Sequence, residues 1–105
     1  MRLTSILLAL YTLAYSANVF AHYPTLSCQV NQSDNTLLDC IAGYSDGSLA
    51  NQSVLKVYSY DDVLQDTVVS KSDGSATIKQ PEGEYYIVFN PGHETPAEFD
   101  YAELE

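Results

Sequence analysis

Basic residues are scarce in this sequence: lysine and arginine together number four, against fourteen aspartates and glutamates, and the formal net charge is −10. A negative field of this size repels phosphate backbones and anionic membrane surfaces, and it attracts small cations. The composition therefore excludes nucleic acid as a partner. Surplus carboxylates also keep small exported domains soluble, so the charge alone does not indicate a function.

Cysteine is scarcer still, with only Cys28 and Cys40 in the chain. In an oxidising compartment, two cysteines that close a short loop form a disulfide, which typically stabilises a domain by about 2–4 kcal/mol. We therefore expect a Cys28–Cys40 disulfide in preference to a reactive thiol or a metal thiolate.

Long apolar runs are absent after the first twenty residues. Residues 6–14 form an apolar run, and Val19-Phe20-Ala21 has aliphatic or small residues at the two positions that matter before a cut, Val19 and Ala21. The run is too short to span a membrane, so we predict a cleaved export signal over residues 1–21. The mature chain, residues 22–105, is then one periplasmic or secreted domain without a membrane insertion. Cleavage after Ala17 is the alternative.

Helical periodicity is also missing. Short apolar runs alternate with Gly, Asn, Asp, Ser or Pro, which is typical of an all-β sandwich, and we predict seven antiparallel strands. Their expected ranges are residues 26–30, 37–44, 54–60, 63–70, 76–79, 85–90 and 98–104. The alternation within them predicts an inward-facing set of Leu55, Val57, Leu64, Val68, Ala76, Ile78, Tyr85, Ile87, Phe89, Phe99 and Tyr101.

Two copies of Ser-Asp-Gly-Ser, at residues 45–48 and 72–75, fall between expected strands. Because glycine accepts a positive φ without strain, we predict turns there. A calcium loop would need alternating oxygen ligands and a later bidentate acid, which neither copy has. The pair Asp61 and Asp62 is likewise predicted to form a hairpin tip and not a catalytic pair.

Four segments of the chain carry a resemblance: GYSDGS at 43–48, LKVY at 55–58, SDG at 72–74 and PEGEY at 81–85. Together they resemble the transthyretin-like, carboxypeptidase-regulatory-like β-sandwich family. With PGHE at 91–94 and a histidine at the mature start, the chain is also similar to small periplasmic proteins associated with bacterial nickel and cobalt uptake. That resemblance implies metal handling at His22 and His93.

The two histidines also suggest a site by their chemistry, since the chain has no others. Once cleaved, His22 offers an α-amine with a pKa of about 8 and an imidazole, which can chelate one metal ion. The imidazole of His93 would complete a histidine brace, which suits Cu(II) and Ni(II). Pro24 has no N–H, so a chelate through backbone amides is excluded. Glu94 and Tyr23 are candidates to lie beside the ligands.

Three functions remain open. We expect an exported protein that captures or hands over a divalent transition metal, Ni, Co or Cu, with a membrane uptake component as recipient. Without a metal, the domain would be a non-catalytic interaction or structural module. A copper mono-oxygenase-like protein is a second alternative, but so small a sandwich leaves little surface for a substrate. No Gly-x-Ser-x-Gly elbow is present, so we expect no enzyme and no catalytic residues.

Overall fold

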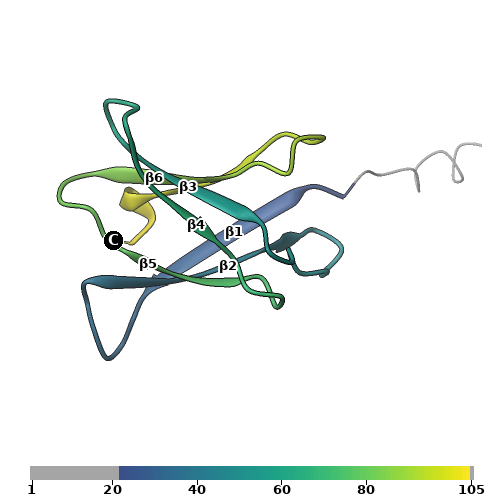
Figure 1. The fold of residues 1–105 in the computed structure, drawn as a ribbon, viewed down its shortest axis with the longest axis horizontal. Coiled ribbons are helices and arrows are strands. Elements are labelled where there is room, and N and C mark those ends of the chain that lie inside the picture. The colour runs from purple at the N-terminus through teal and green to yellow at the C-terminus, as the bar shows by residue number, and fades with distance from the viewer. Residues whose placement is uncertain (1–21, 105) are drawn as a thin grey trace, which may run out of the picture.

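The structure, a computed structural model, describes residues 22–104, so the export signal expected over residues 1–21 lies outside the described residues. Seven strands follow one another and end in a short helix (Figure 1). They are β1 (Pro24–Val30), β2 (Leu37–Tyr44), β3 (Val54–Ser59), β4 (Leu64–Val69), β5 (Ser75–Lys79), β6 (Tyr85–Phe89) and β7 (Ala97–Asp100), followed by the 3₁₀ helix η1 (Tyr101–Leu104). Nothing helical among these residues has the length and apolarity needed to cross a membrane.

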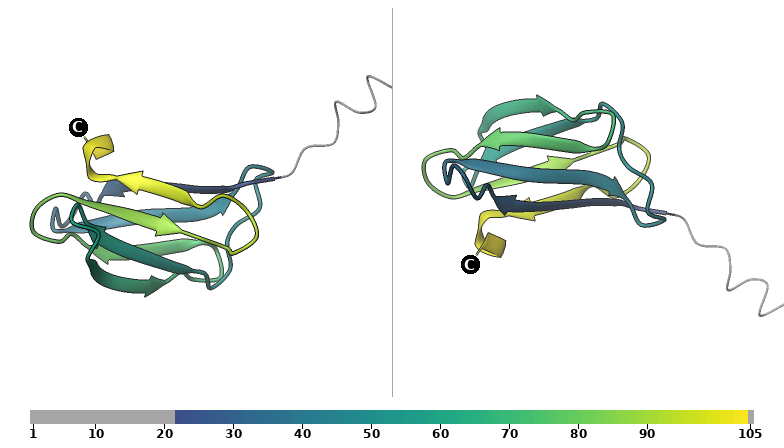
Figure 2. Two further views of the ribbon diagram at one scale, coloured as in Figure 1. Left: turned by 90° about the horizontal axis from the view of Figure 1, so that it is seen from above. Right: turned by 90° about the horizontal axis from the view of Figure 1, so that it is seen from below.

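The strands form two sheets, and all paired neighbours are antiparallel. One sheet has the order β1-β2-β5 and the other the order β4-β3-β6-β7. The two sheets lie as facing layers, with β1 against β7 along one side and β5 near β4 along the other (Figure 2). The seven-stranded antiparallel sandwich expected from the sequence is confirmed.

The core between the sheets contains most of the side chains expected there. Eight of the predicted inward residues are buried: Leu55, Val57, Ala76, Ile78, Tyr85, Ile87, Phe89 and Phe99. Val68 and Tyr101 are partly buried against this cluster. The cluster also includes Leu38 and Ala42 from β2, which the inward set omitted. Residues from both layers therefore share one core.

Leu64 is the exception, since its side chain is 50% exposed. The pairing of β3 with β4 changes register between Val57 and Tyr58, so Leu64 lies opposite Tyr58. Tyr58 is on the outer face of the sheet, because its neighbour Val57 is fully buried. An irregular pairing of this kind reverses the face of every residue beyond it, so the prediction for Leu64 was wrong.

The expected strand over residues 98–104 was wrong in its second half, where the chain turns into η1. Asp100 Oδ1 accepts a hydrogen bond from the Ala102 N–H (2.9 Å), and the Asp100 N–H donates to Glu103 Oε2 (2.8 Å). This reciprocal arrangement is a capping box, which favours a helical turn. Tyr101 still packs edge-on against Tyr85, with ring centroids 5.3 Å apart, which explains why its apolar side chain fitted a strand pattern.

The two Ser-Asp-Gly-Ser segments are turns, as predicted, and both are closed in the same way. Asp46 Oδ1 accepts hydrogen bonds from the N–H and Oγ of Ser48 (2.9 and 2.6 Å). In the second copy, Asp73 Oδ1 does the same with Ser75 (3.0 and 2.6 Å). Side-chain clamps of this type fix the turn locally. Asp61 and Asp62 lie at the tip between β3 and β4, also as expected.

The Cys28–Cys40 disulfide is present, with an S–S distance of 2.12 Å. The two residues lie directly opposite each other in the pairing of β1 with β2. Cys40 belongs to the buried core, whereas Cys28 is partly buried beside it. The bond therefore fastens the edge strand β1 to the interior of the sandwich, and it leaves no free cysteine among the described residues.

Candidate metal site

The start of β1 is held firmly to the turn after β2. The Tyr23 N–H donates to Ser45 Oγ (3.0 Å), and the Ser45 N–H donates to the Tyr23 carbonyl oxygen (2.8 Å). Pro24, the next residue, is buried and pairs with Tyr44. The chain is thus fixed from the residue after His22 onward. The Tyr23 side chain itself is 59% exposed, so the backbone of this residue supplies the anchor.

His22 lies beside the end of β2. Its ring packs edge-on against Tyr44, with centroids 5.2 Å apart and an interplanar angle of 84°. Tyr44 in turn packs against Phe89, the last residue of β6, at 5.8 Å. Both of these contacts have the edge-to-face geometry that is favourable for aromatic pairs. They connect the start of β1, through β2, with the end of β6, where the loop carrying His93 begins.

Asp46 is a neighbour of His22 that sequence reasoning missed. The pKa of the Asp46 carboxyl is lowered mainly by the hydrogen bonds from Ser48, first from the hydroxyl and then from the backbone, and to a smaller extent by the positive charge of His22. The Asp-Gly pair at residues 46 and 47 predicted a turn, but it did not predict which residues would lie beside that turn. Only the pairing of β1 with β2 brings residues 22 and 46 to the same place.

His93 lies in the loop of residues 90–96 between β6 and β7, and its side chain is exposed. Asn90 Oδ1 accepts the Gly92 N–H (2.9 Å), and Gly92 has a φ of 96°, which glycine adopts without strain. This loop and the start of β1 lie at the same end of the sandwich (Figures 1 and 2). Glu94, beside His93, is half-buried.

The two imidazole rings are not in contact with each other. Tyr44 is the ring partner of His22, and the His93 side chain has no hydrogen bond, ion pair or ring contact with another described residue. The structure therefore brings the two segments to one end of the molecule without joining the rings. The arrangement leaves the nitrogen atoms of His93 available to a ligand.

No cluster of three or more His, Cys, Asp or Glu side chains within residues 22–104 is arranged to hold a metal ion. A histidine brace does not require one, because its third nitrogen is the terminal amine, which only cleavage before His22 would create. The residues at this end of the sandwich fit such a site chemically: two imidazoles are exposed, one of them directly precedes the anchored residue Tyr23, and a carboxylate lies near that one.

Comparisons with protein-family models, with curated proteins and with solved structures found no match. They neither support nor oppose the resemblance to the transthyretin-like family or to nickel and cobalt uptake proteins, which stays a prediction. The assignment of the fold rests on the two antiparallel sheets themselves.

Proposed function

We propose that the mature, exported protein binds one divalent transition-metal ion at the start of β1 and captures it or hands it over. The ligands would be the α-amine and imidazole of His22 and the imidazole of His93. The observation that carries the proposal is the double hydrogen bond between Tyr23 and Ser45, which holds the backbone next to His22 in place. A terminal residue next to a fixed backbone loses less conformational entropy when it chelates a metal than a frayed one does.

The electrostatic surroundings support a cation. Fourteen carboxylates in the chain raise the local concentration of positive ions near its surface. The charge of His22 contributes to the lowered pKa of the Asp46 carboxyl. A carboxylate beside a metal-bound imidazole accepts its second N–H, which orients the ring and makes it a better ligand. Asp46 would have this role, and Glu94 lies beside the second histidine.

The donor set selects among metals only weakly. Nitrogen ligands suit Cu(II), Ni(II) and Co(II), and copper binds most tightly of the three by the usual order of divalent ions. The ion carried in the cell would therefore depend on supply. The resemblance to nickel and cobalt uptake proteins favours those two metals, with a membrane uptake component as the recipient.

A second function, that of an interaction module without metal, is favoured by a different observation. Strand β4 lies at the edge of its sheet, and within residues 22–104 its one pairing partner is β3. Its end residues Leu64 and Val69 are 50% and 57% exposed. Exposed apolar edge strands are common sites of pairing with another chain.

The metal proposal is tested on protein exported with its own leader. Mass spectrometry identifies the first residue, and calorimetric titration with Cu(II), Ni(II) and Co(II) measures binding. We expect His22 at the start and one equivalent bound. A variant with one alanine inserted before His22 should lose at least about 100-fold in affinity, because the amine moves out of the chelate ring.

Two results would contradict the proposal. One is equal affinity of the native and the extended N-terminus, which would indicate loose association with carboxylates. The other is unchanged affinity in His93→Ala, which would remove the second imidazole from the site. The circular dichroism spectrum of each variant checks that the sandwich is intact.

A further inference from the structure

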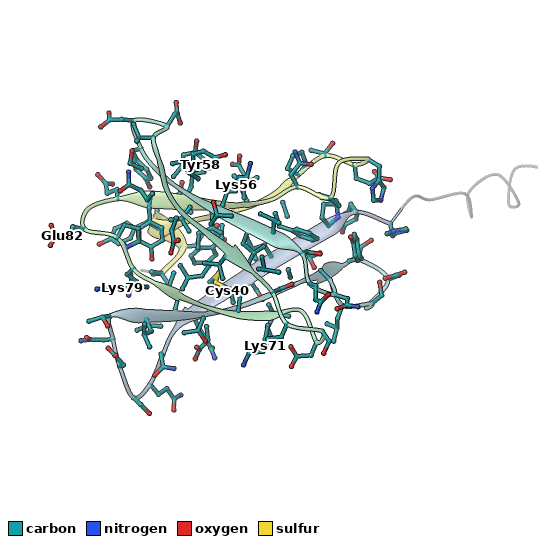
Figure 3. All side chains as sticks on the ribbon, in the orientation of Figure 1. Cys40, Lys56, Tyr58, Lys71, Lys79 and Glu82 are labelled. Carbon is teal, nitrogen blue, oxygen red and sulfur yellow. A yellow bond between two sulfur atoms is a disulfide. The ribbon has the colours of Figure 1, made fainter. Side chains whose placement is uncertain are left out.

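A pocket of about 320 Å³ lies on the outer face of the four-stranded sheet, and neither histidine lines it. It is lined by Val54, Lys56, Tyr58, Val88 and Asn90. These residues share one face, because the positions between them, Leu55, Val57, Ile87 and Phe89, point into the core. Figure 3 shows Lys56 and Tyr58 on the side of β3 that faces away from Cys40.

Lys56 is an isolated cation on this face. Its cross-strand neighbours are Thr67 on β4 and Val88 on β6. In a chain so rich in acids, its ammonium group nevertheless forms no ion pair with any of the described carboxylates. An ammonium beside valines and without a counter-ion is available to an external anion.

The other polar groups of the pocket are also donors. Asn90 lines the pocket, and its Oδ1 accepts the Gly92 N–H while its Nδ2 group is a hydrogen-bond donor with no partner among the described residues. Tyr58 is held by stacking on Tyr86, with ring centroids 5.3 Å apart and planes 18° from parallel, and its hydroxyl can donate as well. An ammonium without an ion pair and an amide donor that line the same pocket favour a ligand that carries acceptor oxygens.

We propose that this pocket binds a small organic monocarboxylate with a flat, largely apolar ring. The carboxylate would accept hydrogen bonds from Lys56 and Asn90, and the ring would lie against Val54, Val88 and the edge of Tyr58. The volume is at the lower end of the range for ligand sites, so one ring is the size that fits. Neither histidine lines the pocket, so this binding would not require the proposed metal ligands.

The test uses benzoate as the probe and benzamide as its neutral counterpart, each titrated into the mature protein while amide NMR signals are followed. We expect benzoate to shift the signals of Lys56, Val88 and Asn90 saturably, and benzamide to bind at least about tenfold more weakly, since charge-assisted hydrogen bonds are lost.

Lys56→Gln and Lys71→Gln form a matched pair, because both remove one positive charge and only the first changes the pocket; Lys71 lies in the turn between β4 and β5 (Figure 3). We expect Lys56→Gln to weaken benzoate binding at least about tenfold, and Lys71→Gln to leave it unchanged. Equal binding by the two lysine variants, equal binding of the two probes, or the absence of saturable shifts would each overturn the proposal.

Discussion

Tyr23 and Ser45 hold each other through two hydrogen bonds, one in each direction, although 22 positions separate them in the chain. One bond uses the Ser45 hydroxyl and the other uses only backbone atoms. The anchor of the N-terminal strand can therefore be weakened by one substitution without being removed, which allows its contribution to the proposed metal site to be measured.

Ser45→Ala should lower the affinity for the metal ion more than it lowers stability. The Tyr23 N–H loses its acceptor at an exposed position, so the free energy of unfolding should fall by only about 0.5–1 kcal/mol. The affinity for Cu(II) should fall by about 3–10-fold, because His22 must be ordered on binding. Ser72→Ala, the same position in the second Ser-Asp-Gly-Ser segment, is the control. If both variants bind as the native chain does, the anchor has no part in the site.

Gly74→Ala should be far more damaging than Gly47→Ala. Both glycines have a positive φ, 80° and 91°. A Cβ on Gly74, however, would lie 2.3 Å from the Ala42 carbonyl oxygen, whereas a Cβ on Gly47 would have nothing within 4 Å. We expect the free energy of unfolding to fall by about 3 kcal/mol or more in Gly74→Ala and by about 1 kcal/mol in Gly47→Ala. Urea unfolding measures both, and equal losses would show that the close approach is relieved at no cost.

Replacement of both cysteines, in Cys28→Ala/Cys40→Ala, should lower the free energy of unfolding by about 3 kcal/mol, the value expected for a bond that closes so short a loop. The native protein unfolded in the presence of a reductant should behave in the same way. A loss well below 1 kcal/mol in both experiments would mean that the core alone fixes β1.

Stability should decrease in acid through the clamped aspartates. The pKa of Asp73 is lowered, first by the Ser75 hydroxyl and then by the Ser75 backbone, and that of Asp46 is lowered in the same way by Ser48. A carboxyl whose pKa is lower in the folded than in the unfolded state stabilises the fold above its unfolded value, here 3.8. This stabilisation is lost as the pH falls through the folded pKa. The midpoint of thermal unfolding should therefore drop as the pH is lowered below 3.8.

The same clamps can be tested one at a time. Ser75→Ala removes the strongest of the bonds to Asp73, so the pKa of that carboxyl should rise toward its ordinary value in an NMR titration. Ser72→Ala, in the same turn, should leave it where it is. A pKa of Asp73 that does not move in Ser75→Ala would show that the backbone N–H alone holds the carboxylate.

Much of the fold could be predicted because its signals are local. Turn residues separate the strands, and alternation within each strand identified most of the core. The prediction for Leu64 was wrong because the change of register after Val57 depends on how two strands pair, and the sequence of a single strand does not show this. At the C-terminus, Asp100 and Glu103 did carry a local capping signal, but the aromatic side chain of Tyr101 suggested a continued strand.

The residues of the candidate site could likewise be predicted from the sequence only in part. His22 and His93 could be selected because histidine is rare in the chain and each has a distinctive sequence position. Tyr44 and Asp46 could not, because their closeness to His22 follows from the pairing of β1 with β2, and contacts between distant segments are not visible in local patterns. The sequence also could not indicate the pocket at Lys56, which is formed by side chains of β3 and β6 together with Asn90 just after β6.

The chain does not complete one sheet before it begins the other. β5 joins the sheet of β1 and β2 only after β3 and β4 have formed part of the opposite sheet. β6 and β7 then join the sheet of β3 and β4. A single cut between β4 and β5 would therefore divide both layers at once and leave two fragments, each with an open face. Each fragment would expose part of the core that the other covers, so we expect such a cut to destabilise the whole sandwich.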